Sequence, residues 1–110
     1  MKVWEFIKGE KEKILADRMR DLLMRELPPD SLKQTGSFVS VNRVTRALEK
    51  TVELAKLHQQ QNALGMISRA RLANNFKWAL TYNNYPDEFV ELATESLIME
   101  LAKIAHKLKD

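Results

Sequence analysis

The chain has 110 residues, of which 45% are hydrophobic and 30% charged, and its net charge is +3, a composition typical of one folded domain. The sequence has no cysteine, which excludes disulfides and thiolate metal sites, and no apolar run approaches the ~20 residues that a membrane-spanning helix needs. We therefore expect a soluble cytoplasmic protein without a membrane partner, folded as a single domain over residues 1–110.

The chain begins with a segment of unusual character, residues 1–9, which reads MKVWEFIKG. It carries Trp4 and Phe6 ahead of a Lys-Gly pair. Its large apolar side chains favour either a helical extension or an arm that docks on a partner. We name it as a candidate docking arm and expect Trp4 and Phe6 to bind the partner.

A first helix is predicted from before Glu10 to about Leu27. Apolar residues recur within it mainly at spacings of three and four, which gives the single apolar stripe of an amphipathic helix. The Pro-Pro pair that follows ends the helix, because proline lacks the backbone donor that a helix interior requires.

Two further helices are predicted between residues 41 and 82. The first follows an N-cap at Ser37 or Ser40 and has an apolar stripe at Val41, Val44, Leu48, Val52 and Ala55. The second extends from about Met66 to Tyr82, with inward positions that include Ile67, Ala70, Phe76 and Leu80. Only Gly65 separates the two helices, and because a lone glycine costs a helix only ~1 kcal/mol, one continuous helix is the alternative.

The last helix follows the turn at Asn83-Asn84-Tyr85-Pro86 and has acidic residues at its start and lysines at its end, as the helix dipole favours. Its apolar residues are spaced in a heptad-like seam: Val90, Ala93, Leu97, Leu101, Ile104 and Leu108. No convincing strand pattern occurs. The sequence therefore predicts an all-α fold, a small bundle of about four helices.

The sequence argues against an enzyme. Neither His58 nor His106 follows a glutamate by three residues, as the ligands of a di-iron bundle do. The three glycines stand apart, so no glycine-rich loop offers a phosphate site, and no motif places a base beside a serine. We expect no catalytic residues, no cofactor and no metal site.

The charges are unevenly distributed along the chain. Residues 31–82 hold eight basic and two acidic side chains, whereas residues 83–102 hold five acidic side chains and no basic ones. Basic side chains bind phosphates, and asparagine amides can add contacts to base edges. We therefore predict a small regulatory protein that contacts nucleic acid through Arg43, Arg46, Lys50, Arg69, Arg71, Asn75 and Lys77.

The alternative is a protein-interaction module, such as a helical adaptor or a subunit of a homo-oligomer. It would use the apolar seam and the acidic face of the last helix, because apolar helical stripes bind in the grooves of partner proteins. Its candidate partner-binding residues are Trp4, Phe6, Leu97, Leu101, Ile104 and Leu108. The two hypotheses are nearly balanced on the sequence.

Overall fold

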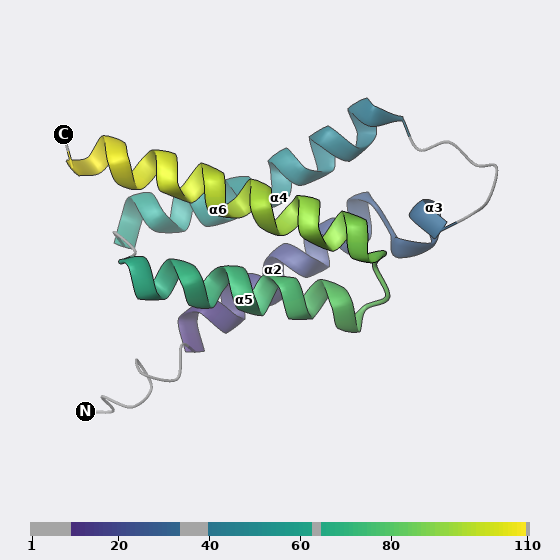
Figure 1. Ribbon diagram of the computed structural model, residues 1–110, viewed down its shortest axis with the longest axis horizontal. Helices are drawn as coiled ribbons and strands as arrows, with labels where there is room; N and C mark the ends of the chain where they lie inside the picture. Colours follow the sequence, from purple (N-terminus) through teal and green to yellow (C-terminus); the bar gives the residue numbers. More distant parts are fainter. Residues whose placement is uncertain (1–9, 34–39, 63–64, 110) are drawn as a thin grey trace.

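The computed structural model describes residues 10–33, 40–62 and 65–109 (Figure 1). The regular elements within these residues are all helical: α2 (Glu10–Glu26), α3 (Pro29–Lys33), α4 (Val41–Asn62), α5 (Met66–Tyr82) and α6 (Asp87–Lys109). The predicted all-α bundle is confirmed, with four long helices and the five-residue α3 as a fifth. The proposed docking arm, with Trp4 and Phe6, lies outside the described residues.

The four long helices form a ring in the order α2, α4, α6, α5. The closely packed pairs are α2 with α4, α2 with α5, α4 with α6, and α5 with α6 (Figure 1). Helices α4 and α5 follow one another in the chain and yet lie at diagonal corners of the bundle. They are separate helices, since α4 ends at Asn62 and Gly65 caps α5 in an extended conformation.

The apolar stripes meet in one core. Its largest fully buried apolar side chains include Met19, Leu23, Phe76, Leu80, Leu97 and Leu101, which come from α2, α5 and α6. Burial of side chains of this size contributes roughly 1.5–3 kcal/mol each. The heptad-like seam of α6 is part of this core, because Val90, Ala93 and Ile104 are buried as well.

Three residues predicted to point inward are exposed instead, namely Val41, Ile67 and Ala70. Val41 is 80% exposed because it is the first residue of α4, at the end of the bundle. Ile67 is 70% exposed. It precedes the buried Phe76 by nine residues, which is two and a half helical turns, so the two side chains lie on opposite faces of α5.

The turn between α5 and α6 has the hydrogen bonds of a Schellman motif. The N–H of Tyr85 donates to the Leu80 carbonyl at 3.2 Å, and the N–H of Asn84 donates to the Thr81 carbonyl at 3.2 Å. Asn84 has a φ of 68°, the left-handed conformation that this motif requires. The turn therefore directs the ring of Tyr85 into the core, where its hydroxyl donates to the Leu27 carbonyl at 2.7 Å.

Ser40, one of the two N-caps predicted for this helix, caps the start of α4. The N–H of Arg43 donates to Ser40 Oγ at 3.1 Å, which satisfies one of the backbone donors that the first turn leaves open. Ser37, the other predicted cap, lies outside the described residues. None of the described helices is long and apolar enough to span a membrane.

Candidate functional site

The residues predicted to contact nucleic acid do not form one surface. Arg43, Arg46 and Lys50 lie on α4, whereas Arg69, Arg71, Asn75 and Lys77 lie on α5, at the diagonally opposite corner of the bundle. The row on α4 is directed toward the end of α2, since Lys50 Nζ lies 3.0 Å from Glu26 Oε1. Arg69 and Lys77 instead line a hollow between α5 and α6. The structure thus divides the predicted basic surface into two parts.

The predicted partner-binding residues of α6 lie inside the bundle. Leu97, Leu101 and Ile104 belong to the core of the single chain and offer no surface to another protein in this fold. The side chain of Leu108 lies outside the described part of the chain. A partner that contacts α6 must therefore meet other side chains of this helix.

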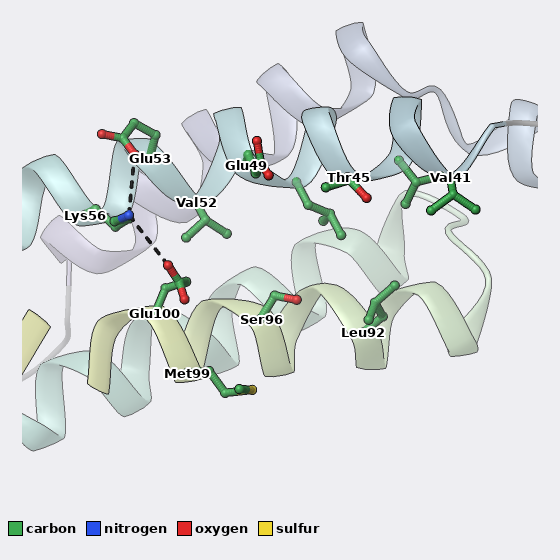
Figure 2. Close-up of a pocket in the computed structure, with 12 residues that line it drawn as sticks. Val41, Thr45, Glu49, Val52, Glu53, Lys56, Leu92, Ser96, Met99 and Glu100 are labelled. Atoms are coloured by element: carbon green, nitrogen blue, oxygen red, sulfur yellow. Dashed lines mark ion pairs between the residues drawn. The ribbon is translucent and has the colours of Figure 1, made fainter. Parts of the chain in front are cut away.

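The structure contains a surface that the sequence reasoning missed, a groove of about 800 Å³ between α4 and α6 (Figure 2). Its apolar lining consists of Val41, Val44, Leu48 and Val52 from α4, and Leu92 and Met99 from α6. Charged side chains line it as well, namely Glu49, Glu53, Lys56 and Glu100. We call this surface the α4–α6 groove.

The floor and the walls of the α4–α6 groove differ in exposure. Leu48 and Val52 are buried and join the groove to the core, whereas Leu92 and Met99 are 49% and 59% exposed. Leu92, Ser96 and Met99 recur at spacings of four and three, so they share one face of α6. Large apolar side chains that remain exposed together are typical of interaction sites.

An ion pair between Lys56 and Glu100 joins the two helices at one end of the groove, and Lys56 also pairs with Glu53 on its own helix. Lys56 Nζ lies 3.6 Å from Glu100 Oε1 and 3.8 Å from Glu53 Oε2 (Figure 2). One turn further along α4, Gln59 Nε2 donates to the Leu101 carbonyl at 3.2 Å. These contacts fix α4 against α6, while Val41 and Leu92 lie at the other end of the groove (Figure 2).

The charged lining of the groove is negative overall, with three carboxylates and one ammonium group. Lys103 Nζ donates to Glu100 Oε2 at 2.9 Å, and this hydrogen bond lowers the pKa of Glu100 below its ordinary value. The charges of Lys103 and Lys56 lower this pKa further. Glu100 is therefore ionised at neutral pH and paired with both lysines.

The sequence held one signal for this groove. Leu92 and Met99 are apolar and lie outside the heptad-like seam, so α6 has more apolar positions than one inner face requires. An apolar stripe of this width indicates a helix that makes apolar contacts on two of its faces. Within the described residues no cluster of histidine and carboxylate side chains could hold a metal ion.

Comparison with protein families, with curated proteins and with solved structures gives no match to this chain.

Proposed function

We propose that this protein is an interaction module that binds an amphipathic helix of a partner protein in the α4–α6 groove. The observation that carries the proposal is the combination of exposed Leu92 and Met99 with a carboxylate-rich lining. A helix bound in a groove inserts apolar side chains at positions i, i+3 or i+4, and i+7. The ligand is therefore an amphipathic helix whose apolar stripe is flanked by lysine or arginine.

The size of the groove supports a helical ligand. Its lining on α4 extends from Val41 to Lys56, which is about 22 Å at 1.5 Å per residue. A partner helix of about four turns has the same length. The two walls are themselves helices, so a third helix laid between them can pack by the same ridge-and-groove rules.

The charges near the groove support a basic ligand. The carboxylates that line it, Glu49, Glu53 and Glu100, outnumber its one cationic side chain, Lys56. Such a surface speeds the approach of a cationic partner and disfavours an acidic one. We therefore expect binding that weakens with salt and that depends on the sign of the peptide's flanking charges.

Contact with nucleic acid remains a prediction, and the geometry supports it less than it supports the binding of a helix. Its residues divide between α4 and α5, and Lys50 is already engaged by Glu26. A phosphate backbone would have to reach two diagonal corners of the bundle. An oligonucleotide is accordingly one of the probes in the experiment below.

Two designed peptides test the proposal. Each has about 16 residues and leucines at helical spacing; one carries lysines beside the stripe and the other carries glutamates. We expect the lysine peptide to bind at least about tenfold more tightly, a difference of about 1.4 kcal/mol, in a fluorescence anisotropy titration. Raising the salt from about 0.1 M to about 1 M shortens the screening length from about 10 Å to about 3 Å and should weaken this binding.

Variants locate the binding site. Leu92→Asp should weaken binding of the lysine peptide about tenfold or more, because it places a charge on the apolar wall. Ile14→Asp is the matched control, since Ile14 on α2 is exposed to a similar extent and lies outside the groove. Equal affinity for the two peptides, or equal loss in the two variants, would contradict the proposal. Tighter binding of a single-stranded oligonucleotide would favour the nucleic-acid alternative.

A further inference from the structure

Helix α5 has an outer face that is unusually apolar for the surface of a single chain. On this face Ile67 and Tyr82 are 70% and 77% exposed, and Trp78 is 45% exposed. The rings of Trp78 and Tyr82 stack on each other, with their centroids 5.8 Å apart. A helix that is apolar on both its inner and its outer face is normally buried.

The charges of α5 and α6 have opposite signs. All charged residues of α5 are basic, namely Arg69, Arg71 and Lys77. The exposed charges in the first half of α6 are all acidic, and they are Asp87, Glu88, Glu91 and Glu95. The two helices lie side by side and antiparallel (Figure 1), so together they form a layer with one basic and one acidic half.

A hollow of about 510 Å³ runs between the two helices of this layer. Small side chains line much of it, including Ala70, Ala73 and Ala102, while Met66 and Ile98 stand exposed in its walls. Small side chains allow another helix to approach closely. The hollow can therefore accept apolar side chains from a surface packed against the layer.

We propose that the α5–α6 layer binds the same layer of a second copy of the chain, with α5 of each copy over α6 of the other. A twofold axis parallel to the helices produces this arrangement and closes the assembly as a dimer. An axis across the helices would instead place α5 over α5, with basic side chains facing each other. Opposite charges therefore face each other only when the twofold axis is parallel to the helices.

The proposed axis also sets the levels at which side chains meet. A rotation about an axis parallel to the helices keeps each residue at its own height along them. Among the residues that line the hollow, Lys77 on α5 and Thr94 on α6 are the nearest to the turn that joins these antiparallel helices, so Lys77 of one copy lies near the level of Glu91 and Glu95 of the other. The cationic and anionic side chains therefore meet at matching heights.

The size of the layer suits a dimer. Helix α5 has 17 residues and is about 25 Å long, and two adjacent helices are about 20 Å wide. This face is comparable with the ~800 Å² per partner that standard interfaces bury, because side chains increase the accessible area above the projected one. The α5–α6 layer and the α4–α6 groove lie on different sides of α6, so this inference does not depend on the proposed function.

Sedimentation equilibrium tests the dimer. The chain has a mass of 12.8 kDa, and we expect about twice this mass at micromolar concentrations. Lys77→Glu should raise the dissociation constant of the dimer about tenfold or more, because it places like charges together. Combining Lys77→Glu with Glu91→Lys and Glu95→Lys should restore association, which a folding defect would not allow.

A matched pair of apolar variants separates the layer from the rest of the surface. Ile67→Asp should give a monomer, whereas Ile14→Asp on α2 should leave the dimer intact. A monomeric wild type at all concentrations, or a dimer unaffected by Lys77→Glu, would overturn the inference. A monomer that binds a single-stranded oligonucleotide through Lys77 would do so too, and would assign this face to nucleic acid.

The two binding surfaces can fail independently. If the chain is monomeric and still binds the lysine peptide, the inference on the α5–α6 layer is wrong and the proposed function stands. If the chain dimerises and no peptide binds, the proposed function is wrong and the inference on the α5–α6 layer stands. Ile67→Asp should leave peptide affinity unchanged, since Ile67 does not line the α4–α6 groove.

Discussion

Tyr85 links three helices through one side chain. Its ring stacks on Phe89 of α6 at 5.2 Å, its hydroxyl donates to the carbonyl of Leu27 at the end of α2, and its backbone N–H donates to Leu80 of α5. Burial raises the pKa of the phenol, so the hydroxyl remains a donor at neutral pH. Because the pKa is raised in the folded state, the stabilisation of the fold by this hydroxyl is fully present below pH 10.0, the ordinary pKa of tyrosine. It is lost only as the pH rises through the raised value.

Replacing Tyr85 by phenylalanine should therefore destabilise the bundle. The buried Leu27 carbonyl would lose its donor, at a cost of about 1–3 kcal/mol in the free energy of unfolding. Urea denaturation measures this change. Tyr82→Phe is the matched control and should change stability by less than about 0.5 kcal/mol, because Tyr82 is exposed. Equal effects of the two variants would refute the role of the Tyr85 hydroxyl.

The ionisation of Glu100 makes the contacts at one end of the α4–α6 groove depend on pH. The hydrogen bond from Lys103 is the main cause of its lowered pKa, and the charges of Lys103 and Lys56 act in the same direction. A lowered pKa in the folded state means that these contacts stabilise the fold above pH 4.5, the ordinary value. The stabilisation is lost as the pH falls through the lowered value.

The Lys103→Ala variant tests this account of Glu100. An NMR titration of the Glu100 carboxyl should give a higher pKa in this variant than in the wild type, because the hydrogen bond is gone. Lys13→Ala, on α2, should leave the titration of Glu100 unchanged. Identical Glu100 titration curves in the two variants would show that Lys103 does not lower this pKa.

At the scale of elements, the end of α5 is determined by the conformation of Asn84. A φ of 68° is strained for residues with a Cβ, although asparagine tolerates it better than most. Asn84→Gly should raise the free energy of unfolding by about 0.5–1 kcal/mol, because glycine adopts this conformation without strain. Asn84→Ala should lower it by about 1 kcal/mol.

Thermal denaturation of these two variants provides the measurement. Asn74→Gly is the control with the same substitution inside α5, where glycine is unfavourable and stability should fall by a few tenths of a kcal/mol. If both glycine variants lose stability, the turn does not depend on the left-handed conformation of Asn84.

The sequence predicted the helices well because their signals are local. The prolines after Leu27 end α2, the Asn-Asn-Tyr-Pro turn precedes α6, and the spacing of apolar residues identified the inner face of α6. The diagonal placement of α4 and α5 could not be predicted, because periodicity gives the face of a helix and not its neighbours. The seven basic and polar residues assigned to one surface were therefore divided by the fold.

The candidate site was harder to predict than the helices. The spacing of Leu97, Leu101 and Ile104 predicts an apolar seam available to a partner, but these side chains are buried in the core of the single chain. The groove depends on Val52 and Met99, which are 47 positions apart in the sequence and meet only after α4 packs on α6. The pairing of Lys50 with Glu26 has the same tertiary origin.

At the scale of the whole molecule, α6 separates two surfaces of different character. The α4–α6 groove has an apolar floor and a negative lining, whereas the α5–α6 layer joins a basic helix to an acidic one. The apolar side chains left exposed on α5 and α6 gather on these two surfaces. This arrangement allows one helix to support both self-association and partner binding.

The most direct measurement of the central claim is an NMR titration of the isotopically labelled chain with the lysine-flanked peptide. We predict that the largest shifts of backbone amides occur in α4 and α6 along the groove, at residues such as Thr45, Val52, Leu92 and Ser96. The amides of α2 opposite the groove should change little. Shifts confined to α5, or no saturable shifts at all, would contradict the proposal that the α4–α6 groove binds a basic amphipathic helix.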